Sequence, residues 1–169
     1  TAGMVSSLMN IGSVNFVLRR FDLSLAYYLQ CTNYSENFTG HNKISSIKGN
    51  LGAVYREIGQ PILALKNFEE SLDECRKKRD TSGIIKALNN IGLVASGFNE
   101  YAKAEKAYRE AIALALKINS LRDISDVYYN LANVVSANQK YDLALEYFTK
   151  SLNATNALGD EEWLAESYN

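Results

Sequence analysis

The sequence predicts an all-α solenoid built from antiparallel helix pairs, and three observations lead to that fold class. The first is a fixed period, because Gly12, Gly52 and Gly92 recur every 40 residues and Ala132 takes the fourth position. A period in this range is typical of stacked supersecondary units. The second is that each period contains two stretches of apolar residues at helical spacing. The third is that only a short polar break separates the two stretches, which forces the two helices to pack antiparallel.

The glycine phase divides the chain into four repeats. They are expected over residues 5–41, 45–84, 85–124 and 125–163, with residues 164–169 beginning a further helix. No connecting stretch is long enough to be an interdomain linker, so residues 1–169 are expected to form a single array. The helical pattern is still running at the last residue, which favours an excerpt of a longer protein with further repeats.

Each repeat has its own pair of apolar stripes. The first-helix stripes are Leu8 with Ile11, Leu51 with Tyr55, Leu88 with Ile91, and Tyr128 with Leu131. The second-helix stripes are Tyr28 with Cys31, Phe68 with Leu72, Tyr108 with Ile112, and Phe148 with Leu152. The breaks between paired helices are predicted at 19–20, 59–60, 98–100 and 138–140.

Proline and glycine mark several helix ends. Pro61 is expected in the first turn of its helix, where its missing N–H would have no partner anyway. Turns or caps between repeats are expected at Gly40, Gly83 and Gly159.

The small residue at the phase of Gly52 has a mechanical explanation. Glycine inside a helix costs about 0.8–1 kcal/mol relative to alanine, so three glycines at one phase indicate a close approach of two helices. A large ring one turn along the second helix is then expected to fill the gap. These rings are Tyr28, Phe68, Tyr108 and Phe148.

Composition and charge exclude several function classes. The chain is 47% hydrophobic and 22% charged with one proline, which favours an ordered globular protein. Its 18 basic and 19 acidic residues are intermixed, so no basic stripe suggests nucleic-acid binding. The run from Arg76 to Arg79 is interpreted as a solvated helix end. No apolar run reaches membrane-spanning length, and no signal peptide is present.

The sequence contains few of the residue patterns that catalytic or metal-binding sites require. His41 is the single histidine and is expected in an exposed turn between repeats. No Cys/His cluster has metal-ligand spacing, and no serine has a histidine partner. Cys31 and Cys75 form no CxxC motif, which agrees with a reducing, cytoplasmic location. The sequence therefore predicts a protein that is not an enzyme and that carries no metal or cofactor.

Two segments resemble a tetratricopeptide repeat. One is the run from Lys48 to Tyr55 with the later Ala64 and Phe68, and the other is Leu88–Gly92 with Tyr101, Ala104 and Tyr108. The ordinary repeat has about 34 residues, so the longer period resembles the long-helix subclass. That subclass includes kinesin light chains, spindle-orientation scaffolds and peptide-sensing bacterial regulators. The resemblance implies a right-handed superhelix whose first helices line the concave face.

A row of asparagines precedes the small-residue positions by two residues. Its members are Asn10, Asn50, Asn90 and Asn130. Asparagine is unfavourable inside a helix, because its amide competes with the backbone for hydrogen bonds. A carboxamide can, however, bond both the C=O and the N–H of an extended peptide. Each contact is worth about 0.5–1.5 kcal/mol net, and the resemblance implies this peptide-contacting role for the four residues.

Further residues share that stripe and are secondary candidates for peptide contact. They are Arg56, Lys86, Tyr129 and Asn133. A structural explanation for the asparagines stays open. Duplicated repeats inherit a residue together, and an asparagine at this phase could instead bridge adjacent first helices.

The favoured hypothesis is a binding module that holds an extended peptide or a protein segment in a concave groove. A second hypothesis is a ligand-sensing regulatory segment of a larger signalling or transcription-regulating protein. A third is a structural scaffold without a groove ligand, and self-association through the terminal repeats is left open. The identity of the partner is not readable from the sequence.

Overall fold

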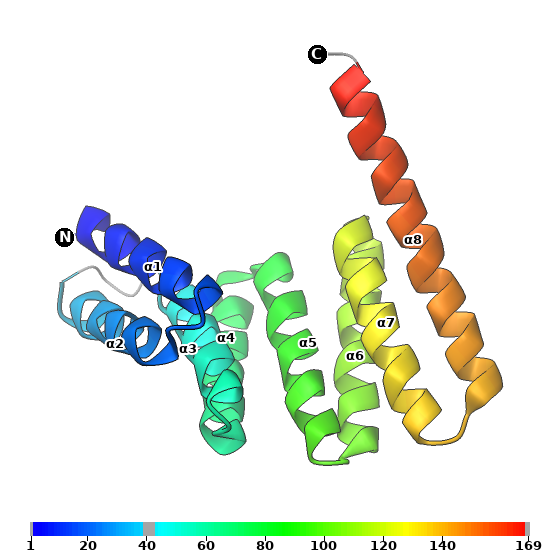
Figure 1. Ribbon diagram of the computed structural model, residues 1–169, viewed down its shortest axis with the longest axis horizontal. Coiled ribbons are helices and arrows are strands. Elements are labelled where there is room, and N and C mark those ends of the chain that lie inside the picture. Colours follow the sequence, from blue (N-terminus) through cyan, green and yellow to red (C-terminus); the bar gives the residue numbers. More distant parts are fainter. Residues whose placement is uncertain (1, 39–42, 168–169) are drawn as a thin grey trace. The chain divides into compact units, whose positions relative to one another are not determined.

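The computed structural model describes the backbone of residues 2–38 and 43–167, and the side chains within 3–35 and 43–159. His41 and Gly40 lie outside these residues. The described residues form eight helices: α1 (Ala2–Val17), α2 (Phe21–Phe38), α3 (Ile44–Glu57), α4 (Pro61–Lys78), α5 (Thr81–Gly97), α6 (Tyr101–Lys117), α7 (Leu121–Ala137) and α8 (Tyr141–Ser167) (Figure 1). Within this part of the chain, no helix is both long enough and apolar enough to cross a membrane.

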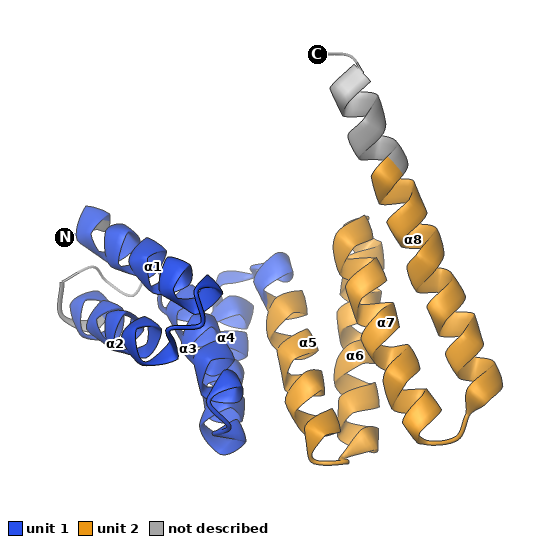
Figure 2. Ribbon diagram, viewed as in Figure 1, with its two compact units in different colours: residues 1–83 blue, residues 84–169 orange. Residues whose placement is uncertain are grey.

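The chain divides into two compact units, residues 1–83 (unit 1) and residues 84–169 (unit 2) (Figure 2). Within unit 1, α1 packs on α2, α2 on α3, and α3 on α4. Within unit 2, α7 packs against both α6 and α8. The helices follow one another as antiparallel pairs, which confirms the predicted fold class, and the unit boundary lies one residue from the predicted junction of the second and third repeats.

The turns between helices repeat one backbone geometry. A residue with positive φ stands at positions 19, 59, 79, 99, 119 and 139, and Gly59 is the one glycine among them. The next residue then donates its N–H to the carbonyl five positions earlier, as Gln60 does to Tyr55 at 2.8 Å and Glu100 does to Ala95 at 2.9 Å. This is the 6→1 hydrogen bond of a Schellman helix end. The predicted breaks are confirmed, and Pro61 is the first residue of α4 as expected.

The large rings lie directly over the small residues of the first helices. A Cβ atom added to Gly52 would stand 2.6 Å from Cε1 of Phe68, and one added to Gly92 would stand 2.6 Å from Cε1 of Tyr108. At Gly12 the corresponding distance to Tyr28 is 2.8 Å. The expected close approach is confirmed, with an aromatic ring rather than a backbone as the contacting surface.

A hydrogen bond to a backbone carbonyl also ties paired helices together. The Oγ of Ser71 donates to the carbonyl of Ser45 at 2.8 Å, and the Oγ of Ser151 donates to the carbonyl of Ser125 at 2.9 Å. Cys31 occupies the same phase, and its Sγ lies 3.7 Å from the carbonyl oxygen of Val5. A thiol or hydroxyl group at this phase thus links three of the four pairs, and Ala111 at the same phase of α6 carries no such group.

Two predicted breaks are wrong. Gly83 is the third residue of α5, and the carboxylate of Asp80 caps that helix by accepting the Gly83 N–H at 2.9 Å. Gly159 lies inside α8, which continues through Ser167, so the helix expected to begin at 164–169 is not a separate element. A single glycine costs a helix only about 1 kcal/mol relative to alanine, which does not by itself end the helix.

Candidate peptide-binding surface

Unit 2 has an open, polar cavity of about 420 Å³, called here the unit 2 cavity. Three helices contribute to it: α5, α7 and α8. The lining residues are Asn89, Ser125, Asp126, Tyr129, Asn130, Ser151 and Thr155. Tyr129 and Asn130 were predicted as peptide contacts, and both line this cavity.

Asn130 forms a hydrogen bond between two first helices. Its Nδ2 donates to the Oδ1 of Asn89 at 2.9 Å, which links α7 to α5. The bridging role that the sequence left open for these asparagines is therefore realised at this position. The bond uses one N–H of Asn130 and one lone pair of Asn89, and two carboxamides carry more donors and acceptors than that. Both residues still line the cavity.

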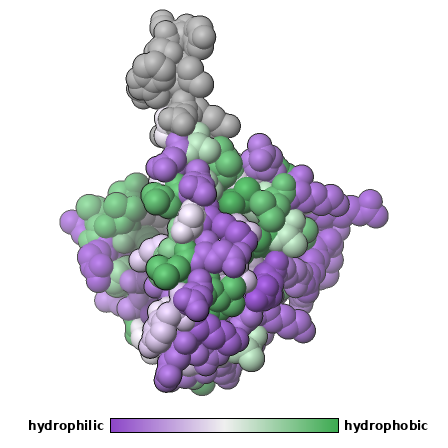
Figure 3. All heavy atoms as spheres, turned by 90° about the vertical axis from the view of Figure 1, so that its right-hand side faces the viewer, coloured by the Kyte–Doolittle hydropathy of each residue, from purple (hydrophilic) through white to green (hydrophobic). Residues whose placement is uncertain are grey.

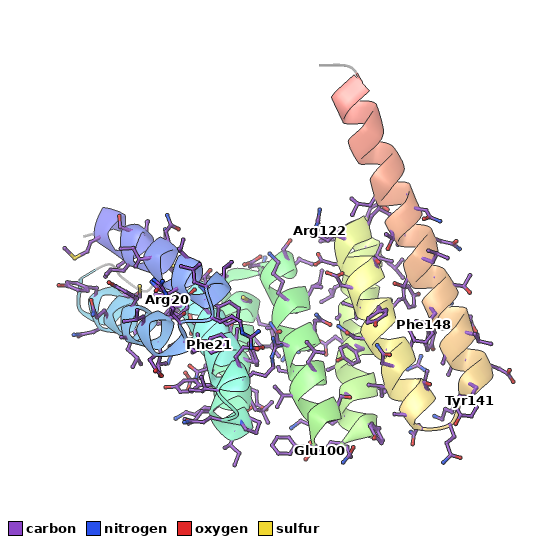
Figure 4. All side chains as sticks on the ribbon, in the orientation of Figure 1. Arg20, Phe21, Glu100, Arg122, Tyr141 and Phe148 are labelled. Carbon is purple, nitrogen blue, oxygen red and sulfur yellow. The ribbon has the colours of Figure 1, made fainter. Side chains whose placement is uncertain are left out.

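The ring of Tyr129 packs against an aromatic ring of the next helix. Its ring meets the ring of Phe148 edge-on, with centroids 5.7 Å apart, and Phe148 reaches it from α8 (Figure 4). The Tyr129 side chain is nevertheless 55% exposed. Edge-to-face aromatic pairs contribute about 0.5–1.5 kcal/mol beyond the area they bury, and the exposed part of the Tyr129 ring stays available for contact. A partly exposed aromatic ring beside polar groups is a suitable contact for an apolar side chain of a ligand.

A cluster of three hydroxyl groups from α7 and α8 lines part of the cavity. The Oγ of Ser125 lies 2.6 Å from Oγ1 of Thr155 and 3.3 Å from Oγ of Ser151. The sequence analysis did not identify these three residues. A signal existed, since Ser125 and Ser45 share the phase of the buried residues Val5 and Ile85, where a hydroxyl group needs a polar partner.

Asp126 supplies the one charge among the lining residues. Asp126 is exposed and lies in the second turn of α7. The lining residues consequently combine a carboxylate, two carboxamides, three aliphatic hydroxyl groups and the phenol of Tyr129, which together suit a ligand rich in N–H donors.

The remaining unit 2 candidates lie near the cavity in sequence but do not line it. Asn90 is partly exposed, and Lys86 is exposed. Asn133 is exposed, and its Nδ2 donates to the backbone carbonyl of Tyr129 at 3.0 Å. That bond within α7 occupies part of the Asn133 amide, which weakens its case as a ligand contact.

Unit 1 carries the other candidates. Asn10 is exposed and Asn50 is partly exposed, so neither side chain is buried in the core. The guanidinium of Arg56 pairs with the carboxylate of the next residue, Glu57, at 3.0 Å. Each unit thus presents two of the four asparagines, and none of the four is buried.

Two sequence profiles described as tetratricopeptide repeat match the chain, one over residues 3–73 and 43–117 and the other over residues 125–157. No curated protein matches it.

Several solved structures share the fold at low sequence identity. BtubC (BKLC) from P. vanneervenii is 16% identical, with a TM-score of 0.83 over 92% of this chain and 64% of its own. Aspartyl phosphate phosphatase F from Bacillus subtilis is 18% identical, with a TM-score of 0.86 over 96% of this chain and 43% of its own. The Rap conjugation gene regulator of plasmid pLS20, in complex with the Phr* peptide, is 19% identical, with a TM-score of 0.77 over 86% and 41%. The chain therefore spans between 41% and 64% of the length of these structures.

Proposed function

The chain belongs to the tetratricopeptide repeat family, and on that premise we propose that it is a peptide-binding module. The unit 2 cavity receives part of an extended peptide, with Asn89 and Asn130 bonding its backbone. Tyr129 packs against one of its side chains. Asn10, Asn50 and Asn90 extend the same role to other parts of the peptide, with Arg56, Lys86 and Asn133 as secondary contacts.

The observation that supports this proposal is the grouping of Asn89, Asn130 and Tyr129 around one open cavity. An extended peptide backbone presents alternating donors and acceptors that must be satisfied when it leaves water. Carboxamides supply both kinds of group without reading side chains. The exposed ring of Tyr129 adds an apolar contact, and apolar groups in such cavities commonly supply much of the affinity.

Asp126 indicates which peptides the cavity prefers. A carboxylate at its rim attracts an amino-terminal amine or a basic side chain, and no cation among the lining residues competes with that attraction. Charge-assisted hydrogen bonds are roughly twice as strong as neutral ones. We therefore expect peptides with a basic residue next to an apolar one.

The direct test begins with a random peptide library displayed on phage and selected against the whole chain. The peptide that is enriched is then titrated calorimetrically against the chain and against Asn89→Ala/Asn130→Ala. Removing both partners of the Asn89–Asn130 bond leaves no unpaired amide behind. We expect a loss of about 1–3 kcal/mol, or roughly 5- to 150-fold in Kd.

The matched control is Asn153→Ala, which removes an exposed carboxamide of α8 that does not line the cavity. It should leave the affinity unchanged while helicity stays the same in all variants. The proposal is wrong if no peptide is enriched, or if the double variant binds the selected peptide as tightly as the parent.

The regulatory alternative has one specific observation in its favour. One of the matched structures is a conjugation gene regulator bound to a peptide, and this chain matches less than half of that protein. A peptide-sensing segment that is joined to an output domain would likewise make up only part of its protein. That the segment is not an enzyme, needs no cofactor and is cytoplasmic stays a prediction.

A further inference from the structure

Unit 1 has a cavity of its own beside the turn between α1 and α2, with a volume of about 340 Å³, called here the turn cavity. Its lining residues are Arg19, Arg20, Phe21, Asp22, Leu23 and Ile58. Figure 4 labels Arg20 and Phe21, which stand where α2 begins. Residues 19–23 form the turn and the start of α2, whereas Ile58 directly follows α3. The turn cavity therefore lies between two consecutive repeats of unit 1.

The turn cavity does not depend on what precedes α1. Each repeat of a solenoid contacts only the neighbouring repeats on its two sides. Within unit 1, α2 packs on α3, and Ile58 contributes to the cavity from the second of these two repeats. A repeat before α1 would pack on the side of α1 that faces away from Ile58, and it would leave the turn cavity open.

The turn holds one of its two arginines in a defined place. Arg19 has a left-handed backbone with a φ of 57°, and the next residue, Arg20, donates its N–H to the carbonyl of Asn15 at 2.8 Å. The Arg19 guanidinium lies over the ring of Phe21, with its central carbon 5.4 Å from the ring centroid. The same ring meets Phe16 edge-on at 5.6 Å. One guanidinium is thus positioned on an aromatic wall of the cavity.

Both guanidinium groups are free to meet a ligand. Among the residues that the structure describes, neither Arg19 nor Arg20 forms an ion pair or a side-chain hydrogen bond, and both are exposed. Arg56 and Arg109, in contrast, each pair with a carboxylate of their own helix, at 3.0 Å and 2.8 Å. Asp22 is the one acidic residue among those that line the turn cavity. Two cations and one carboxylate give this cavity a net positive charge.

The two arginines are not needed to form the turn. The equivalent positions make the same turn with other residues, which are Gly59 with Gln60, Asn99 with Glu100, and Gln139 with Lys140. Glycine and asparagine adopt a positive φ at a lower cost than arginine does. Local backbone structure therefore does not account for this pair of cations, whereas an anionic ligand would.

The rest of the cavity wall is apolar. Leu23 is 49% exposed, and Phe21 and Ile58 are partly exposed. A ligand that covers this wall needs an apolar side chain next to its acidic group. Nucleic-acid binding normally needs an extended basic stripe, and the 18 basic and 19 acidic residues of this chain are intermixed. A protein segment fits both parts of the cavity better.

From this combination we propose that the turn cavity docks an acidic segment of a partner protein, in which an aspartate or glutamate stands beside a large apolar residue. The carboxylate of that segment bonds to the guanidinium groups of Arg19 and Arg20, whose planar geometry matches it. The apolar side chain packs on Leu23 and Ile58. Asp22 repels a second carboxylate on the far side of the arginines, which fixes the direction of the segment.

This site is independent of the function proposed above, because the two cavities differ in charge. Asp126 is the one charged residue that lines the unit 2 cavity, and hydrophilic and hydrophobic residues are interspersed on the α8 side of that unit (Figure 3). The unit 2 cavity is expected to prefer basic peptides, and the turn cavity acidic ones. The chain then has two sites for two different kinds of segment.

The test selects a random peptide library displayed on phage against the whole chain, after phage that bind Arg19→Gln/Arg20→Gln have been removed. The enriched peptides should carry an aspartate or glutamate next to a large apolar residue. In fluorescence anisotropy, an enriched peptide should bind Arg19→Gln/Arg20→Gln roughly 10- to 150-fold more weakly than the parent chain. It should bind Asp22→Asn more tightly than the parent, because that substitution removes a repulsive charge.

The matched control is Lys78→Gln/Arg79→Gln, which removes two cations at the turn after α4. Arg79 has the same left-handed backbone, with a φ of 55°, and neither residue lines the turn cavity. This variant should keep the Kd of the parent, and circular dichroism should show unchanged helicity in all variants. The proposal is overturned if no peptide is enriched, or if the enriched peptides lack acidic residues. A control that weakens binding as much as Arg19→Gln/Arg20→Gln also overturns it, and so does full displacement of the peptide by an equal concentration of single-stranded DNA.

Discussion

The pairing of one small residue with one large ring decides how closely two helices of a repeat approach. Phe68 is fully buried, and its ring occupies the volume that a side chain at Gly52 would need. A planar ring inside a packed core has no rotamer that moves it away without loss of other contacts. Ala132 shows the alternative, because its partner Phe148 is only partly buried.

Gly52→Ala should therefore destabilise unit 1 by about 1–3 kcal/mol, the usual cost of overpacking a core. The measurement is the urea midpoint followed by circular dichroism. Gly49→Ala in the same helix is the matched control, because an added Cβ there meets only the Oγ of Ser71 at an ordinary 3.5 Å. That variant should gain up to about 1 kcal/mol from helix propensity. Equal effects of the two substitutions would contradict the ring-over-glycine explanation.

Asn130 has a structural role that is compatible with the proposed role in binding. Its bond to Asn89 holds two first helices in register, and both residues still line the unit 2 cavity. The hydrogen bond between Asn130 and Asn89 thus offsets part of the helix-propensity cost of asparagine in the absence of a ligand. This explains why the sequence pattern alone could not separate the structural from the binding interpretation.

At the scale of helices, each pair in unit 1 is closed by a small side chain that reaches across to a carbonyl. Cys31 makes this contact in the α1–α2 pair, and Ser71 makes it in the α3–α4 pair. Cys75 lies one turn beyond Ser71 and is buried as well. Burial raises the pKa of both thiols above the ordinary value of 9.0, because the thiolate loses its hydration.

This raised pKa predicts that unit 1 becomes less stable in alkaline solution. The folded state keeps both thiols protonated, whereas the unfolded state releases their protons near pH 9.0. The contribution is fully present below that pH and is lost as the pH rises through the raised folded pKa. The urea midpoint should fall over this range. Cys31→Ala/Cys75→Ala should show a shallower fall, and an identical slope in the two proteins would refute the assignment to the thiols.

The helix ends show where sequence patterns stop being informative. The breaks within repeats were predicted correctly, but Gly59 is the only glycine among the six left-handed turn residues, and Arg19, Arg79 and Gln139 are not typical of that conformation. Glycine conversely failed as a marker at Gly83 and Gly159, which are helical. The same backbone hydrogen bond to the carbonyl five positions earlier closes all six turns, whatever residue has the positive φ.

For the molecule as a whole, the 40-residue period was sufficient to predict the helix pairs and the stripe that carries the asparagines. It could not predict the unit 2 cavity, because that cavity depends on Ser151 and Thr155 of α8, a second helix. A repeat period predicts only the features that successive repeats have in common. A site that combines residues of three helices, as the unit 2 cavity combines residues of α5, α7 and α8, becomes visible only in three dimensions.

The most direct test of the peptide-binding account is nuclear magnetic resonance of the asparagine side-chain amides during titration with the selected peptide. The account predicts that the NH₂ signals of Asn89 and Asn130 shift together and reach saturation with the same Kd, while the signal of Asn153 stays in place. Unmoved Asn89 and Asn130 signals at saturating peptide, with shifts at Asn153 instead, would contradict it.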